Sequence, residues 1–300
     1  MAITNTVITA TALMEQRPDV PAGYWTRIIR PRKRLLDIDL KGLWRYRDLW
    51  YMYIKRDIVT YYKQTILGPL WFLIQPVLTT VMYMFVFGGL AGISTDGAPQ
   101  PLFYLSGIML WNYFSDSFNS SSNVFATNAS VFGKVYFPRL VVPLAGITSN
   151  LLKLLIQMLL FIAVFIGYAI SGLEVHLNAT LLLFPFYVLL LAFHALSWGL
   201  IISSLTSKYR DFRFLVSFGL QLFMYATPVI YPLSIAGEKF RWVLELNPLT
   251  PIFEAFKYGC LSCGSFSWGG LLYSTCFMLV TLFLSVIVFN RVERNFMDTV

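Results

Sequence analysis

The stretch LLKLLIQMLLFIAVFIGYAI at residues 151–170 is twenty residues long and carries one charged side chain, that of Lys153. At about 1.5 Å per residue, an α-helix of this length matches a bilayer hydrocarbon core of about 30 Å. Similar apolar stretches lie on both sides of it along the chain. The six expected spans are Pro69–Gly89, Leu102–Asn123, Leu151–Ile170, Leu181–Leu205, Phe214–Pro232 and Leu271–Phe289. The sequence therefore predicts an all-α integral membrane protein.

Composition supports this class. Hydrophobic residues make up 57% of the chain and charged residues 13%, whereas soluble domains carry about 25% charged residues. The apolar runs are continuous, unlike the alternating strands of about ten residues that build membrane barrels. The net charge of +8 comes from residues beside the apolar runs, so we expect no nucleic-acid partner. Residues 1–19 lack the basic and apolar regions of a cleavable signal peptide.

Lysine and arginine positions predict the orientation in the membrane. With the N-terminus placed in the cytoplasm, the cytoplasmic segments hold 19 of the 23 basic residues and the outer loops hold three, while Lys153 lies within a span. Basic residues concentrate on the cytoplasmic side of membrane proteins. Both termini are therefore expected in the cytoplasm.

Three parts are predicted along the chain: a basic cytoplasmic tail (1–40), an amphipathic helix (41–68) and a domain of six spans (69–300). On a helix, most charged residues of 41–68 fall on one side and the aromatic and aliphatic residues on the other. The charged set is Lys41, Arg45, Asp48, Lys55, Arg56 and Lys63, and the apolar set is Leu43, Tyr46, Trp50, Tyr53, Ile54 and Tyr61. We expect this helix in the cytoplasmic interface with its apolar face in lipid; a helix of a small soluble domain is the alternative.

The stretch Ser234–Ser267 is too polar to span simply, yet it contains apolar patches. Two short re-entrant helices dipping into the outer leaflet are one interpretation. Backbone that is not a spanning helix is tolerated at that depth when protein or water covers it. A plain extracellular loop is the other interpretation.

Catalytic motifs are missing from the sequence. It contains no G-x-x-x-x-G-K-[ST], no HExxH and no GxSxG, so we expect no nucleotide, metal or cofactor site in this chain. His176 falls in a short outer loop, and His194, within the fourth span, is expected to bond a neighbouring helix. Cys260 and Cys263 form a CxxC without a redox-fold context, which leaves ordinary thiols and a local disulfide both open.

Asp116 is the main ionisable residue within the expected spans, and it lies in a serine- and asparagine-rich half-helix. Such a segment either lines a hydrophilic conduit or bonds neighbouring helices. Aromatic residues in mid-span either stack on sugar rings or pack in the core. The candidates for the lining of a conduit are Asp116, Asn119, Tyr83, Phe223 and Tyr225.

An ordered set of short motifs runs from about Leu43 to Val300. The set comprises RDI at 56–58, YKQT at 62–65, LGPLW at 67–71, QP at 75–76, KVYFPR at 134–139, YRD at 209–211, PV at 228–229, YP at 231–232, NPLTP at 247–251 and RVERNF at 291–296. The set resembles the polysaccharide-export permeases, which are membrane subunits of ATP-binding-cassette transporters of the second exporter type. The O-antigen and capsule exporters of Gram-negative bacteria are most similar, and the teichoic-acid exporters are near relatives. The basic tail before Leu40 and the cysteine pair depart from this pattern.

The resemblance implies a homodimer with two separate ATPase subunits that use ATP and Mg. It implies that the amphipathic helix and one loop touch these ATPases; the loop residues are Lys134, Val135, Tyr136, Phe137, Pro138 and Arg139. It places an outer gate at Asn247, Pro248 and Pro251. It implies a lipid-linked glycan as substrate, which we take to be carried on undecaprenyl diphosphate. On charge grounds, we expect Arg47, Lys55 and Arg56 to contact that diphosphate.

Other functions remain open at this point. An ATP-driven exporter of teichoic acid, small lipids or drugs would share the general fold. An ion-coupled secondary transporter would usually carry more than one intramembrane acid. A membrane-embedded enzyme would need a clustered catalytic set, which we do not find in the sequence.

Overall fold

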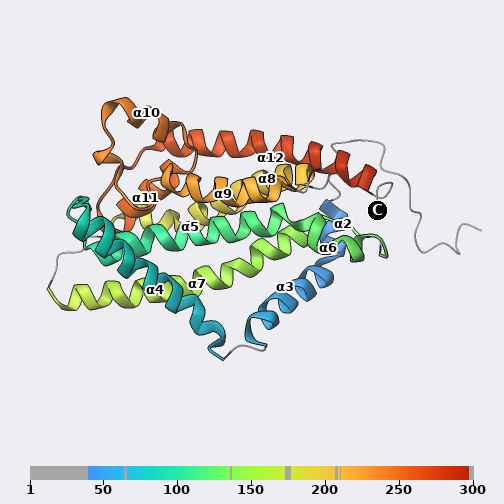
Figure 1. The fold of residues 1–300 in the computed structure, drawn as a ribbon, viewed down its shortest axis with the longest axis horizontal. Helices are drawn as coiled ribbons and strands as arrows, with labels where there is room; N and C mark the ends of the chain where they lie inside the picture. Colours follow the sequence, from blue (N-terminus) through green and yellow to red (C-terminus); the bar gives the residue numbers. More distant parts are fainter. Residues whose placement is uncertain are drawn as a thin grey trace, which may run out of the picture. The chain divides into compact units, whose positions relative to one another are not determined.

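The computed structural model describes residues 40–63, 66–135, 137–172, 177–206, 209 and 211–296. Within these residues every regular element is helical (Figure 1). In chain order the elements are α2 (Leu40–Arg45), α3 (Arg47–Tyr62), η1 (Gly68–Leu70), α4 (Trp71–Tyr83), η2 (Met84–Leu90), α5 (Gln100–Ser122), α6 (Val124–Phe132), α7 (Val141–Ile170), η3 (Ala179–Leu183), α8 (Phe184–Thr206), α9 (Phe212–Tyr225), η4 (Leu233–Ile235), α10 (Glu238–Leu246), α11 (Thr250–Leu261) and α12 (Trp268–Phe296). The all-α prediction is confirmed, and the basic tail predicted over 1–40 lies almost wholly outside the described residues.

Four helical segments of the described chain are long and apolar enough to cross a membrane. They are Gly68–Leu90, Val141–Ile170, Ala179–Thr206 and Trp268–Val292. The helix α5 has 23 residues but is more polar, and α9 is apolar but has only 14 residues. The fifth predicted span thus ends at Tyr225 instead of Pro232, because Pro228 lacks the N–H of a helical residue and disfavours helical backbone before it. The helix of the third predicted span begins at Val141, ten residues before the predicted start at Leu151.

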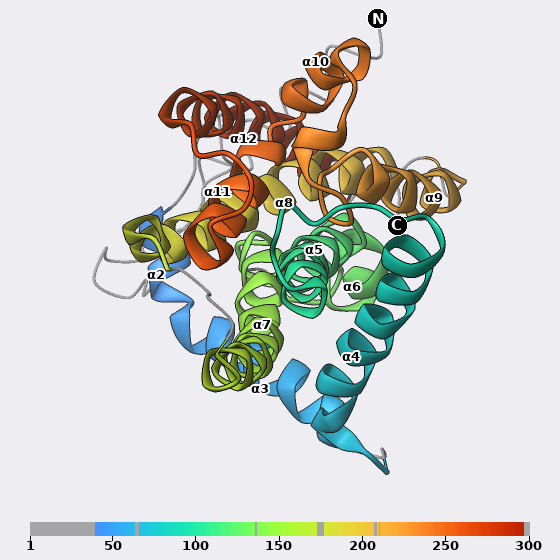
Figure 2. The same ribbon diagram turned by 90° about the vertical axis from the view of Figure 1, so that its left-hand side faces the viewer.

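The helix α5 forms the centre of the bundle. It packs against α7, α8, α4 and α11, and 16 of its 23 residues are buried. Figure 2 shows α5 enclosed by α4, α7 and α8 when the bundle is seen end-on. Among its serine, asparagine and aspartate residues, Ser106, Ser117, Ser121 and Ser122 are buried, while the others are half-buried or exposed.

Close approach of the neighbouring helices to α5 depends on glycine. A Cβ on Gly146 of α7 would collide with the Ser120 hydroxyl, and a Cβ on Gly199 of α8 would collide with Ser121. Small residues at helix contacts let backbones approach closely in membrane proteins. The two glycines thus set the distances between α5 and its two main partners.

The apolar side of the N-terminal helices packs on protein. Tyr53 is buried, and Tyr46, Trp50 and Ile54 pack against the core beside α7. The expectation that this face lies in lipid is therefore wrong, because the bundle itself supplies the apolar surface that covers it. Hydrophobic side chains of α2 and α3 that are exposed instead are Trp44, Tyr51 and Met52.

Two short helices, α10 and α11, occupy the stretch Ser234–Ser267. Ten of the twelve residues of α11 are buried, and α11 packs against α5, α8, α12 and η3. In Figure 1, α10 and α11 lie at the same end of the bundle as η2 and the first turn of α5. The interpretation as two helices is thus favoured over a plain loop.

We predict that Gly146→Val and Gly199→Val each destabilise the protein, because each added side chain overpacks a contact with α5. Overpacking typically costs about 1–3 kcal/mol, which thermal unfolding in detergent would detect as a lower midpoint. The control is Gly167→Val on α7, where a Cβ would meet no atom within 4 Å. Equal midpoints for all three variants would contradict this account of the packing.

Candidate functional site

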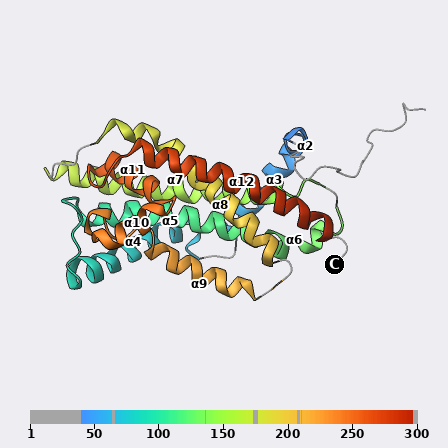
Figure 3. The ribbon, with the colours of Figure 1, turned by 90° about the horizontal axis from the view of Figure 1, so that it is seen from above.

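A groove with a partly polar lining lies between α4, α5 and α9. Figure 2 and Figure 3 show α4 and α9 on the same side of α5. One cavity in this groove has a volume of about 560 Å³. Its lining residues are Tyr83, Trp111, Ser115, Asn119, Ser217, Phe218, Leu220, Gln221, Leu222, Met224 and Tyr225. Three of the predicted conduit residues, Tyr83, Asn119 and Tyr225, therefore meet in one cavity.

A second hollow, of about 260 Å³, continues the groove along α5 and α9. It shares Asn119 and Ser217 with the first cavity and adds Asn123, Thr206 and Arg213. We call the two hollows together the polar groove. It extends from tyrosine and tryptophan rings at one end to a single guanidinium group, that of Arg213, at the other.

Helical periodicity explains this lining. Ser115, Asn119 and Ser122 are spaced four and three residues apart on α5, so they share one face. On α9, successive groove residues are four positions apart: Arg213, Ser217, Gln221 and Tyr225. The sequence reasoning missed Arg213, Ser217 and Gln221. The four-residue spacing of polar groups inside an apolar run was the signal that could have found them.

Phe223 lies on a different side of α9 from the polar groove. Its ring lies 6.1 Å from that of Trp111 and 5.3 Å from that of Trp198. It also lines an apolar pocket between α5, α8 and α9. Phe223 therefore belongs to an aromatic cluster that joins α9 to α5 and α8.

Asp116 bonds α7. Its carboxylate accepts a hydrogen bond from Lys153 Nζ at 2.9 Å. The same ammonium group lies 4.6 Å from the centre of the Tyr61 ring and 5.6 Å from that of Phe72. One ion pair thus connects α3, α4, α5 and α7. Of the two hypotheses for Asp116, interhelical bonding is the one supported by direct contacts.

The predicted diphosphate contacts Arg47, Lys55 and Arg56 lie on the exposed side of α3. The Arg56 guanidinium bonds Asp57 at 2.8 Å and covers the Tyr53 ring at 4.5 Å. Arg47 lies 3.8 Å from Asp48, and both side chains are exposed. These residues do not line the polar groove, because α3 packs against α7 whereas α9 packs against α8.

The predicted ATPase-contact loop divides into exposed and buried residues. Lys134 and Val135 are exposed. Phe137 is buried, with its ring 6.3 Å from Tyr53 and 5.7 Å from Phe132. Pro138 is half-buried. Arg139 is buried, and its guanidinium lies 5.4 Å from the centre of the Phe132 ring. Tyr136 lies outside the described residues.

Asn247 fastens the predicted outer gate to the end of α9. Its buried side-chain amide donates to Ala226 O and to Thr227 Oγ1, both at 2.9 Å. Its Oδ1 accepts from the backbone of Leu249 at 3.0 Å. Pro248 is buried next to it, and Pro251 stands half-buried in the first turn of α11.

Lys257 of α11 bonds the segment that follows α9, and its side chain is buried, with the residue 1% exposed. Its ammonium donates to Pro228 O at 2.6 Å and lies 3.8 Å from the centre of the Phe103 ring. Gly107 makes room here, because a Cβ on it would collide with Val229 O. The break after α9 is therefore held by buried bonds from α11 and by close contact with α5.

Other candidate groups have structural partners or no cluster around them. His194 is buried and its Nε2 bonds Ser274 Oγ at 3.1 Å, as expected for a core histidine. Cys260 and Cys263 are free thiols and both are buried, so the disulfide interpretation is not supported. His176 lies outside the described residues. Within the described ranges, no group of three or more potential metal ligands occurs.

We predict that Asp116→Asn lowers the free energy of unfolding, because it leaves the Lys153 ammonium without its counter-ion. The two side chains are 42% and 18% exposed, so the loss should be about 1 kcal/mol, between surface and buried pairs. Adding Lys153→Met to this variant should restore most of the lost stability, measured by thermal unfolding. Asp48→Asn, which removes an exposed acid, is the matched control. Unchanged stability with impaired transport would instead assign Asp116 to a conduit.

Related proteins share much of this chain. The O-antigen export system permease protein RfbA of Klebsiella pneumoniae is 28% identical over 84% of this chain and 94% of its own length. A Myxococcus xanthus protein of the same name is 28% identical over 73% of this chain and 82% of its own length. The polysialic acid transport protein KpsM of Escherichia coli is 24% identical over 80% and 91%, respectively.

A family model described as ABC-2 type transporter matches residues 48–261. That range begins in α3, contains α4 to α10 and ends with the last residue of α11. It thus includes every residue of the polar groove and more than half of the chain. The chain therefore belongs to the ABC-2 type transporter family of membrane proteins.

Proposed function

We propose that this chain forms half of the channel of an ATP-driven exporter, which moves lipid-linked polysaccharide such as O antigen or capsule across the inner membrane. The observation that carries the proposal is the polar groove, a path along the helices whose lining combines hydroxyl and amide groups with aromatic and aliphatic side chains. Membership of a transporter family and the names of the relatives support it. They favour a transport subunit over an embedded enzyme or an ion-coupled carrier.

The proposed topology has six spans with both termini in the cytoplasm. The second span is α5. Its polarity is compatible with a place in the membrane, because neighbouring helices bury 16 of its 23 residues. Short α9 is the fifth span, completed by the segment that Lys257 and Asn247 hold. The helices α10 and α11 would dip into the outer leaflet, with protein covering α11. The asymmetry of basic residues supports this orientation.

A second copy of the chain would complete the channel. A polar groove facing lipid is unfavourable, because hydrocarbon offers no hydrogen bonds. Closed two-fold pairing is the commonest symmetry of homo-oligomers. The helices α4 and α9, which border the groove, carry many exposed apolar side chains, among them Leu78, Met82, Phe218 and Leu222. Pairing along these helices would turn two grooves into one enclosed path.

The lining of the groove suits a sliding sugar polymer. Ser115, Asn119, Ser217 and Gln221 offer hydroxyl and amide groups that bond sugar hydroxyls. Tyrosine and tryptophan rings at one end offer flat faces to sugar rings. Each contact is weak and exchangeable, which lets a polymer advance without a deep binding site. Asn247, Pro248 and Pro251 would close the outer end.

The motor would be a separate ATPase pair that uses ATP and Mg, because the sequence holds no phosphate-binding loop. Exposed Lys134 and Val135 would contact it. Buried Phe137 would pass the motion to Tyr53 of α3, and α6 would pass it to α5. Arg47, Lys55 and Arg56 on the exposed side of α3 would make the first contact with the diphosphate of the lipid carrier.

The test is to co-purify this chain with the ATPases encoded beside its gene and to measure ATP hydrolysis in lipid vesicles. We expect a stable complex of two copies of each chain, with a rate that rises when undecaprenyl-diphosphate-linked glycan is added. An unlinked small lipid or drug is the comparison substrate. Failure to associate with any ATPase, or transport driven by an ion gradient alone, would refute the proposal.

We predict that Ser217→Trp cuts glycan export by about tenfold or more, because an indole would fill the narrow part of the groove between its two hollows. Export would be measured as glycan reaching the vesicle lumen. The matched control is Leu215→Trp, which places the same side chain on an exposed position of α9 outside the groove lining. Normal export by the Ser217 variant would exclude the groove as the path.

A further inference from the structure

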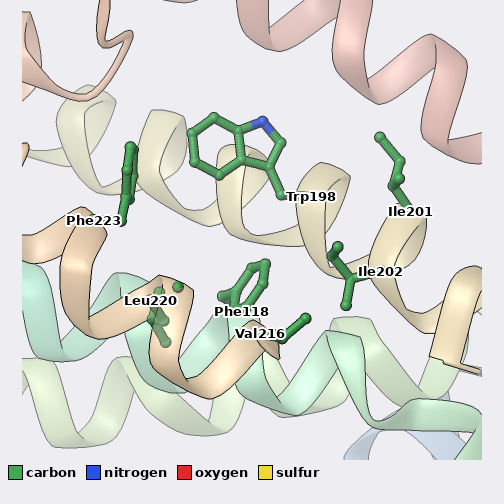
Figure 4. Close-up of a pocket in the computed structure, with 8 residues that line it drawn as sticks. Phe118, Trp198, Ile201, Ile202, Val216, Leu220 and Phe223 are labelled. Atoms are coloured by element: carbon green, nitrogen blue, oxygen red, sulfur yellow. The ribbon is translucent and has the colours of Figure 1, made fainter. Parts of the chain in front are cut away.

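An apolar pocket lies between α5, α8 and α9, next to the polar groove (Figure 4). Its volume is about 400 Å³, and its lining carries almost only carbon. The lining residues are Phe118, Trp198, Ile201, Ile202, Val216, Gly219, Leu220 and Phe223. In Figure 4 the Trp198 and Phe223 rings close one end, while Ile201 and Ile202 stand at the other. The proposed glycan path does not need this pocket, because a carbon surface offers no hydrogen bonds to the hydroxyl groups of a hydrated glycan.

The pocket and the polar groove adjoin each other. Ile202 and Val216 line both the apolar pocket and the smaller hollow of the groove. On α9, Gly219 and Phe223 line the pocket, while Ser217 and Gln221 line the groove. Leu220 lies between them and lines both. Apolar and polar space thus meet beside the first turn of α9, as a molecule with an apolar tail and a polar head would require.

Arg213 stands where the two spaces meet. It lines the smaller hollow together with the polar side chains of Asn123 and Thr206. Its side chain is exposed, and no carboxylate within the described ranges forms an ion pair with it. A guanidinium presents five donors in a fixed fork and binds phosphate oxygens in pairs. The group is therefore available to a phosphate-bearing head.

We propose that this combined site holds the lipid carrier of the glycan: the part of the polyprenyl chain next to the head in the apolar pocket, and the diphosphate at Arg213. The attached glycan would then leave the diphosphate directly into the polar groove, along Ser217 and Gln221. The inference rests on the proposed function, and it names where that substrate is held. A bilayer phospholipid has a similar head and tail but no polymer to place in the groove, so we assign the site to the polyprenyl diphosphate.

This site lies on other elements than the basic residues of α3. Arg47, Lys55 and Arg56 lie on a helix that packs against α7, whereas Arg213 lies in the first turn of α9. The α3 residues would meet the carrier first at the membrane surface. Arg213 would hold it while the glycan enters the groove, so the two sets act in sequence.

Gly219 gives a direct test of the pocket. A Cβ on Gly219 would meet no atom within 4 Å, so Gly219→Trp fills the apolar space without a backbone collision. In the reconstituted complex we expect the concentration of undecaprenyl-diphosphate-linked glycan that gives half-maximal ATPase stimulation to rise by about tenfold. Gly167→Trp on α7, whose Cβ position is equally open, is the control. Equal values for both variants would overturn the proposal.

The head-group half is tested at Arg213. We expect Arg213→Gln to raise the same half-maximal concentration by about tenfold, since it removes one charge-assisted contact. Arg213→Lys should recover part of the loss, because it keeps the charge without the fork. Arg291→Gln, at an exposed arginine of α12, should change nothing. An unchanged value for Arg213→Gln would remove the diphosphate from this position.

A binding measurement separates this inference from the proposed function. A photoactivatable polyprenyl diphosphate is added to the purified wild-type chain, and the labelled peptides are identified by mass spectrometry. Labelling of α8 and α9 that excess phosphatidylglycerol does not suppress supports the site. Labelling confined to other helices, or equal competition by phosphatidylglycerol, overturns it. The labelling result decides the lipid site whether or not glycan stimulates ATP hydrolysis. Absence of that stimulation would count against the proposed function and leave the lipid site to the labelling result.

Discussion

A polar side chain inside a bilayer needs a partner in protein or water, because hydrocarbon supplies no hydrogen bonds. The second half of α5 is rich in such side chains, and the bundle is arranged around it. Gly146 and Gly199 let α7 and α8 close on it, and Asp116 reaches Lys153 across the α7 contact. The side toward α4 and α9 is hollowed by the polar groove. The polar groove and the packed core thus lie on two faces of one helix.

The helix α9 has the opposite character, since none of its 14 residues is buried. One of its sides faces the polar groove and another faces the apolar pocket. Its end is held firmly, because Lys257 bonds Pro228 O and Asn247 bonds Ala226 O. The helix therefore has one end bonded to the bundle, while its own side chains stay half-buried or exposed.

The N-terminal helices contribute through their contact with α7. Their apolar side covers the bundle, and Tyr53 meets Phe137 of the loop between α6 and α7. A force on that loop would therefore reach α3 and α5 together, through an aromatic contact and through α6. The exposed side of α2 and α3 combines basic residues with Trp44, Tyr51 and Met52. Such a surface suits the boundary between head groups and hydrocarbon, where both kinds of side chain find partners.

The sequence by itself determined the helical membrane class, the four strongly apolar spans and the family, because hydrophobic length and ordered local motifs are readable without contacts. It also identified Tyr83, Asn119 and Tyr225, which meet in one cavity. Tertiary structure decided which side of each helix faces which neighbour. It turned Asp116 toward Lys153, placed Phe223 beside Trp198, and brought Arg213 to the junction of polar and apolar space. These outcomes depend on contacts between residues far apart in the chain, and helical periodicity alone fixes only which residues share a face.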